Sequence, residues 1–187
     1  MCKTQYGITK DDAFKILDNI NMWIGNCDGK ASTILAGIGI ITAVVFSSDV
    51  FSRLYSIVIG SFSKSGWLLI FSVILWISII SMFAGAACFV MTLIPRLRYS
   101  YKVKSKDHPK FESIMFYGAV GDLEFSSYKT KADKITNDKV MDDLYFQITS
   151  AAKICKTKFQ YLRKGIIFFF VGLLFFVITV GVFAIVK

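Results

Sequence analysis

The chain has few prolines, few charged residues and one histidine. Its 187 residues include two prolines, and 19% are charged against 55% that are apolar. This composition excludes an intrinsically disordered chain and a collagen-like repeat. The histidine, His108, stands beside Pro109 in a charged segment without a second metal ligand nearby. We therefore predict no metal site, and a catalytic triad would lack its base.

Sequence signatures of the common enzyme classes are also missing. There is no Walker loop, no GxGxxG, no HExxH and no paired-carboxylate motif. The four cysteines, Cys2, Cys27, Cys88 and Cys155, include no CxxC pair. We therefore predict a protein that is not an enzyme and that carries no cofactor.

Charge is absent from three long apolar blocks, residues 31–48, 67–94 and 165–186. At about 1.5 Å per residue they would form helices of roughly 27, 42 and 33 Å, against a hydrocarbon core of about 30 Å. The second helix would have to tilt or protrude into the headgroup layer. The sequence thus predicts a mainly α-helical integral membrane protein with three transmembrane helices and with its termini on opposite sides.

Basic residues set the expected orientation. Residues 1–30 hold four lysines, residues 49–66 hold one lysine and one arginine, and residues 95–164 hold fifteen basic residues against eight acidic ones. Retained cytoplasmic segments carry the lysine and arginine excess, so we place residues 1–30 and 95–164 in the cytoplasm. The cysteines then lie in cytoplasmic parts or within a span, and no disulfide is predicted.

The surplus of positive charge predicts a lipid partner. Residues 95–164 carry +7, fifteen minus eight, of the formal net charge of +9. The basic run at residues 96–106 follows directly on a span, where anionic headgroups are the nearest polyanion. We expect contact with membrane lipids and no nucleic-acid partner. Because the first apolar block begins at residue 31, we also expect no cleavable signal peptide.

Two cytoplasmic stretches show helical periodicity. Thr9, followed three residues later by Asp12, resembles a capping box at the start of a helix. An apolar stripe follows on this helix, which leads into the first span. The stripe would lie on the membrane surface or on other cytoplasmic helices. This stripe consists of Phe14, Leu17, Ile20, Ile24 and Cys27. Asn137 or Asp138 would cap a long helix that continues through Lys164 into the third span. Its apolar stripe consists of Val140, Leu144, Ile148, Ala151, Cys155 and Phe159.

The segment before this long helix is less clearly patterned. Residues 111–117 are rich in β-branched and aromatic side chains, which suits either a strand or a buried turn. Ser126 or Ser127 would cap a short helix that ends at Ile135. Together with residues 1–30, these pieces predict a small cytoplasmic sensor domain.

The strongest local signal for a ligand lies at the mouth of the first span, in Asn21 and the sequence Asp28-Gly29-Lys30. One interpretation is a solvated pair at the membrane interface, with Lys30 extending to the headgroups. The other is a cyclic-nucleotide site. Such a ligand presents an anionic cyclic phosphate, a ribose 2′-hydroxyl and a base edge, which call for a cation, a carboxylate and a side-chain amide. Asp28, Lys30, Asn21 and Gln147 supply these groups.

These residues also belong to a wider pattern that resembles the membrane effectors of the bacterial Pycsar system, the pyrimidine cyclase system for antiphage resistance. The resemblance covers nearly the whole chain, in order and spacing around three spans. It is carried by Asn21, residues 28–32 (DGKAS), residues 113–118 (SIMFYG), Tyr128, residues 143–148 (DLYFQI) and residues 158–159 (KF).

The resemblance implies that a partner uridylate or cytidylate cyclase makes a cyclic pyrimidine mononucleotide, cCMP or cUMP, on infection. The cytoplasmic part would sense this second messenger and the membrane helices would impair the inner membrane, which causes abortive infection. Residues 49–66 and the C-terminus would then be periplasmic. The expected ligand-binding residues are Asn21, Asp28, Lys30, Gln147, Lys153 and, as a stacking partner for the base, Tyr117. Cytosine and uracil are not distinguished, because an Asn or Gln amide suits either edge.

The spans themselves suggest how such an effector would act. Three spans are few for an enclosed pathway, so we expect a homo-oligomer. Small residues on the second span would allow close helix packing within one protomer or between protomers. They are Ser81, Ala84, Gly85 and Cys88. The phenylalanines of the third span, at positions 168, 169, 170, 175, 176 and 183, are expected to face lipid. Because no span contains a charged residue, non-selective disruption or a hydrophobic gate is favoured over a charge-lined ion pathway.

Two alternative functions stay open at this point. A holin-like or toxin-like membrane protein would damage the bilayer without any ligand and would be toxic on modest expression alone. A structural membrane subunit would dock another protein through its cytoplasmic part. It would show neither nucleotide binding nor loss of membrane integrity.

Overall fold

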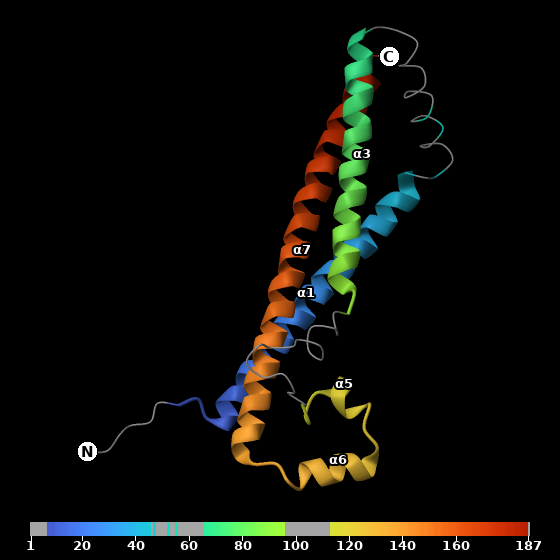
Figure 1. Ribbon diagram of the computed structural model, residues 1–187. Helices are drawn as coiled ribbons and strands as arrows, with labels where there is room; N and C mark the ends of the chain where they lie inside the picture. The colour runs from blue at the N-terminus through green and yellow to red at the C-terminus, as the bar shows by residue number, and fades with distance from the viewer. Residues whose placement is uncertain are drawn as a thin grey trace, which may run out of the picture. The chain divides into compact units, whose positions relative to one another are not determined.

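The computed structural model describes residues 7–45, 47, 52, 55, 66–95 and 113–186 (Figure 1). This part of the chain forms helices and contains no strand. In chain order the helices are α1 (Lys10–Val45), α3 (Gly66–Leu93), α5 (Tyr117–Val120), α6 (Phe125–Ala132) and α7 (Asn137–Val186).

Three of these helices are long and apolar enough to cross a membrane. The segments with this property are Lys10–Val44, Ile70–Leu93 and Asn137–Val182, within α1, α3 and α7 respectively. The prediction of a mainly α-helical integral membrane protein with three transmembrane helices is therefore confirmed.

Helix α1 begins at the capping box that the sequence predicts. The Thr9 hydroxyl donates to Asp12 Oδ2 over 2.6 Å, and the Asp12 backbone N–H donates back to Thr9 Oγ1 over 3.2 Å. These bonds satisfy donors that an isolated first turn leaves without partners. Of the predicted stripe, Cys27 is buried and the other four members are half-buried, whereas Asp11, Lys15, Asp18 and Asn26 are exposed.

Helix α7 runs without interruption for 50 residues. At about 1.5 Å per residue its length is roughly 75 Å, more than twice a hydrocarbon core of about 30 Å, so a large part of it must lie outside the core. The predicted continuation from Asn137 through Lys164 into the third span is confirmed. Leu144 is buried and the other five members of the predicted stripe are half-buried.

The chain divides into two compact units. Unit 1 comprises Met1–Asn26 and Pro95–Thr157, and unit 2 comprises Cys27–Ile94 and Lys158–Lys187. Helix α1 contributes to both units, and so does α7.

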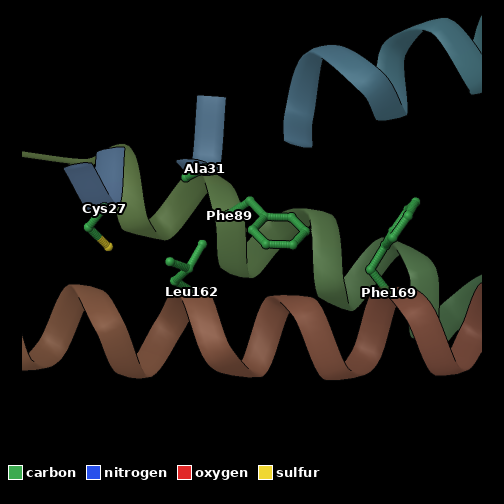
Figure 2. Close-up of a cluster of buried hydrophobic side chains, with 5 residues drawn as sticks. All are labelled: Cys27, Ala31, Phe89, Leu162 and Phe169. Atoms are coloured by element: carbon green, nitrogen blue, oxygen red, sulfur yellow. The ribbon is translucent and has the colours of Figure 1, made fainter. Parts of the chain in front are cut away.

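Unit 2 contains an apolar core built from all three long helices. Its buried members are Cys27 and Ala31 of α1, Phe89 of α3, and Leu162 and Phe169 of α7 (Figure 2). The rings of Phe89 and Phe169 meet edge to face, with centroids 6.4 Å apart. Phe169 is thus an exception to the expectation that the third-span phenylalanines face lipid. Its neighbours Phe168 and Phe170 are exposed, as expected.

Helices α3 and α7 approach each other closely within unit 2. The Ser81 hydroxyl donates to the Phe168 carbonyl over 2.8 Å, and Gly85 lies against the backbone of α7 at Phe169. Small side chains permit this contact because they let two helix backbones come together. Packing within one protomer therefore accounts for Ser81 and Gly85 of the predicted small-residue stripe. Ala84, another member, is exposed.

In unit 1 the predicted bounds of the short helix are wrong, and the described part of the stretch 111–117 is not a strand. Helix α6 begins at Phe125, after Glu124 in an extended conformation, and ends at Ala132, so Ser126 and Ser127 lie inside the helix and neither caps it. The expected end at Ile135 is also wrong. Of the stretch 111–117, residues 111–112 lie outside the described residues. Residues 114–116 form a bend that leads into α5, and residues 113–116 are not a strand.

Candidate functional site

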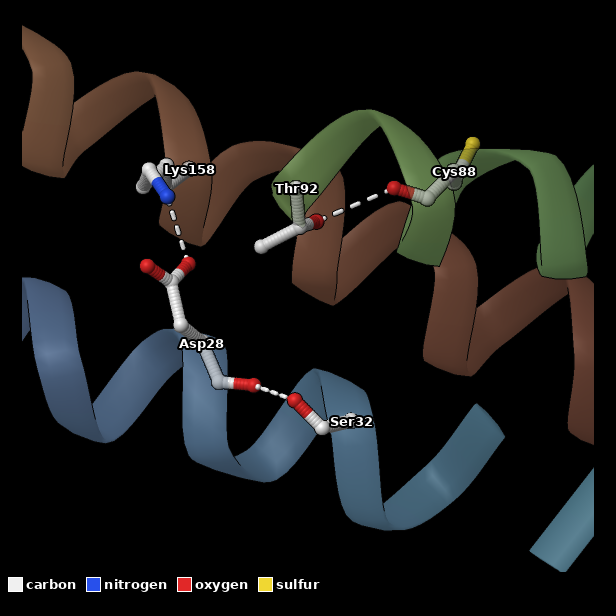
Figure 3. A network of polar contacts seen from close by, with 5 residues as sticks. All are labelled: Asp28, Ser32, Cys88, Thr92 and Lys158. Carbon is white, nitrogen blue, oxygen red and sulfur yellow. Dashed lines mark hydrogen bonds and ion pairs between the residues drawn. The ribbon is translucent and has the colours of Figure 1, made fainter. Parts of the chain in front are cut away.

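An ion pair joins α1 to α7 in unit 2. The Lys158 ammonium donates to Asp28 Oδ1 over 2.5 Å (Figure 3). The Lys158 side chain is 6% exposed and that of Asp28 is 35% exposed. Burying a lysine this deeply requires a compensating acceptor, and Asp28 provides it.

The pair borders the apolar core of unit 2. Asp28 follows Cys27 directly on α1, and Lys158 precedes Leu162 by one turn on α7. Lys158 also lies three residues after Cys155, so it falls on the apolar face of α7 rather than on its solvated face. The core packing thus fixes where the two charged groups meet.

Neighbouring hydroxyl groups are used within their own helices. Ser32 Oγ donates to the Asp28 carbonyl over 2.7 Å, and Thr92 Oγ1 donates to the Cys88 carbonyl over 3.0 Å (Figure 3). Such bonds to the preceding turn satisfy a hydroxyl in an apolar setting. Neither hydroxyl donates to the Asp28 carboxylate, which accepts instead from the Lys158 ammonium.

Lys30 does not share this location. It is exposed, and two residues along a helix turn it by about 200° from Asp28. Lys30 and Asp28 therefore lie on different sides of α1. The cation beside Asp28 is Lys158.

A second buried carboxylate, Asp143, organises unit 1. Ser113 Oγ donates to both of its oxygens, over 2.7 and 2.9 Å, and the N–H groups of Ile114 and Met115 donate to Oδ2 over 3.0 and 3.1 Å. The Gln147 amide donates to Oδ1 over 3.2 Å. Asp143 is 2% exposed. With four donor groups on its two oxygens, this carboxylate fastens the turn at residues 113–116 to α7.

The remaining predicted binding residues are distributed over unit 1. Asn21 on α1 and Lys153 on α7 are exposed. Gln147 is half-buried, and its NH₂ group is bound to Asp143. Tyr117 begins α5, but its side chain lies outside the described residues. In the described part of the chain, no three His, Cys, Asp or Glu side chains come close enough to hold a metal ion.

Sequence reasoning missed two of the most connected side chains. Lys158 interrupts the apolar stripe of α7. Because a lysine is rarely buried without a partner, a lysine on an apolar face indicates an acidic residue on the helix that packs there. Asp143 precedes the buried Leu144 and lies at the edge of the same stripe. Both belong to sequence blocks through which the chain resembles the Pycsar effectors.

Comparison with known proteins gives the same assignment over most of the chain. A family model described as the Pycsar effector protein domain, PycTM, matches residues 12–185. The chain is 29% identical to the Pycsar effector protein GmPycTM of Gulbenkiania mobilis over an alignment of 192 positions, which covers 93% of this chain and 92% of that protein. No solved structure matches. Because the family match begins in the first turn of α1 and ends in the last turn of α7, the chain belongs to the PycTM family of Pycsar effectors, membrane proteins of antiphage defence.

Proposed function

We propose that this Pycsar effector senses cCMP or cUMP, made by a partner cyclase on infection, and responds by impairing the bacterial inner membrane. The family supports the role in defence. The observation that carries the proposed coupling is the continuity of α1 and α7. Each is one unbroken helix that joins a polar, amphipathic part in unit 1 to an apolar part in unit 2.

This continuity gives ligand binding a direct route to the membrane helices. A ligand shifts an equilibrium only as far as its affinities for the two states differ. If it prefers one arrangement of the amphipathic parts, no flexible linker within α1 or α7 absorbs the change before the apolar parts begin. Abortive infection follows when the altered helices no longer keep the membrane intact.

The proposed orientation places residues 1–30 and 95–164 in the cytoplasm and the C-terminus in the periplasm. It rests on the concentration of basic residues in these two segments. The cytoplasmic location exposes the sensor to a soluble second messenger. We also propose that several copies assemble, because the three spans of one chain are few to enclose a pathway across the membrane.

Nucleotide titration tests the sensor directly. The detergent-purified protein is titrated with cCMP and cUMP, with cAMP and cGMP as controls, and thermal stability is followed. A ligand that binds the folded state raises the melting temperature, so we expect stabilisation by one pyrimidine nucleotide and not by the purine nucleotides. Folded protein that responds to none of the four would contradict the sensor and favour a ligand-independent toxin.

Dye release tests the membrane response. The protein is reconstituted into vesicles that contain a self-quenched dye, and the pyrimidine nucleotide identified above is added. We expect release to depend on that nucleotide. Release of equal size without nucleotide would point to a holin-like protein, and no release under either condition would point to a structural subunit.

A further inference from the structure

The ion pair between Asp28 and Lys158 has hydrogen-bonding capacity that the described residues do not use. An ammonium group has three donors, and among the described residues only Asp28 Oδ1 accepts from Lys158. Asp28 Oδ2 receives no donor from the described part of the chain. A lysine side chain that is 6% exposed has little water with which to satisfy its other two donors. The arrangement therefore suits a further acceptor beside Lys158.

The pair can be reached from solvent on the side of Asp28. The Asp28 side chain is 35% exposed, whereas the Lys158 side chain is 6% exposed. A ligand that approaches the pair therefore meets the carboxylate first, and the flexible Lys158 side chain turns outward to bring its ammonium to the ligand. Oδ1 can hold Lys158 in place while Oδ2 accepts a hydrogen bond from the ligand.

Adjacent cationic and anionic groups match one edge of a nucleoside cyclic monophosphate. On that edge the ribose 2′-hydroxyl, a donor, stands next to the anionic cyclic phosphate. We propose that Asp28 Oδ2 accepts from the ribose 2′-hydroxyl and that Lys158 donates to the cyclic phosphate. This inference rests on the proposed function and assigns the phosphate contact to Lys158 instead of Lys30, which lies on another side of α1.

The same site would act on the contact between the first and third membrane helices. Asp28 belongs to α1 and Lys158 to α7, and the next turn of each helix contributes Ala31 and Leu162 to the core of unit 2. A ligand held by both side chains alters the forces between these helices at the edge of that core. Binding and packing are thereby linked within one unit.

Affinity measurements on single variants test the assignment. For the nucleotide that stabilises the wild-type protein, we expect Asp28→Asn and Lys158→Met each to weaken binding by about tenfold or more, as for a lost charge-assisted hydrogen bond. The exposed Asp18→Asn and Lys164→Met serve as matched controls and should retain wild-type affinity. Unchanged affinity in Asp28→Asn or Lys158→Met would overturn the proposal, and so would a loss confined to Lys30→Met.

The exchanged pair separates ligand binding from a structural role. Asp28→Lys combined with Lys158→Asp rebuilds an ion pair but presents the carboxylate where the phosphate should bind. We expect this double variant to regain thermal stability relative to the single variants while it stays defective in binding. Recovery of both properties would show that the pair is structural only.

A 2′-deoxy analogue of the nucleotide tests the Asp28 contact on the wild-type protein, so the result does not depend on whether a variant folds. Wild-type protein should bind the 2′-deoxy cyclic nucleotide about tenfold more weakly than the ribonucleotide, because Asp28 loses its donor. Equal affinity for the two would refute the Asp28 contact. If wild-type protein binds no cyclic nucleotide at all, the proposed function fails, whereas binding that ignores these substitutions removes only the present inference.

Discussion

Gly85 of α3 and Gly165 of α7 lie face to face in unit 2. A Cβ atom on Gly85 would stand 2.9 Å from the Gly165 carbonyl oxygen and 2.6 Å from the Phe169 backbone nitrogen. A Cβ atom on Gly165 would stand 3.1 Å from the Gly85 carbonyl oxygen. Since these neighbours are backbone atoms, they cannot turn away as the end of a side chain would. The absence of a side chain at Gly85 sets how closely the two helices pack.

Gly85→Ala should therefore destabilise unit 2. Overpacking a close contact costs about 1–3 kcal/mol, which outweighs the gain of up to about 1 kcal/mol from the better helix propensity of alanine. We expect a lower melting temperature in detergent. Gly37→Ala is the matched control, because a Cβ at Gly37 meets nothing within 4 Å. Equal stability of the two variants would contradict the close packing.

Asp143→Ala should release the turn at residues 113–116 from α7. The substitution leaves Ser113 and the N–H groups of Ile114 and Met115 without their common acceptor. We expect a loss of about 2–4 kcal/mol in the stability of this turn, seen as faster amide hydrogen exchange at Ile114 and Met115. Asp142→Ala, at an exposed neighbouring position, should leave their exchange unchanged. Wild-type protection in Asp143→Ala would show that the turn is held by other contacts.

The long helices could be predicted from the sequence because their signals are local. Uncharged blocks of sufficient length mark the spans, and Thr9 with Asp12 marks the start of α1. The predicted start of α6 was wrong. Serine is a common helix cap, which favoured Ser126 or Ser127, but the residue before the helix is Glu124, and its side chain makes no capping hydrogen bond. The partner of Gly85 was left open, since a small-residue stripe suits contacts within or between protomers equally well.

The candidate site was predicted only in part, because its charges come from distant segments. Asp28 was recognised, but the cation expected beside it was Lys30, its neighbour in sequence. The structure pairs it with Lys158, 130 residues away. Periodicity places Lys158 on the apolar face of α7, yet it does not reveal which helix that face meets. Gln147 was expected to recognise the base, but its amide donates a hydrogen bond to Asp143. Their spacing of four residues allows this bond on a helix, yet spacing alone does not show that it forms.

Thr9→Ala should fray the first turn of α1. The substitution removes the hydroxyl that donates to Asp12 and accepts from its backbone N–H. Loss of such a cap costs about 1 kcal/mol, so amide exchange at Asp12 should accelerate while exchange further along α1 is retained. Asp11→Ala, which changes an exposed residue of the same turn, is the control. Equal exchange at Asp12 in both variants would mean that the capping box contributes nothing measurable.

Reporter fusions test the proposed orientation. Three spans with residues 1–30 in the cytoplasm place the end of α7 in the periplasm. Alkaline phosphatase fused after Lys187 should therefore be active, and green fluorescent protein at the same position should be dark. A fusion after residue 110, which follows only two spans, should give the opposite pattern. Fluorescence from the full-length C-terminal fusion would show that the orientation is the opposite of the one proposed. The segment with the net charge of +7 would then lie outside the cytoplasm, away from any soluble second messenger.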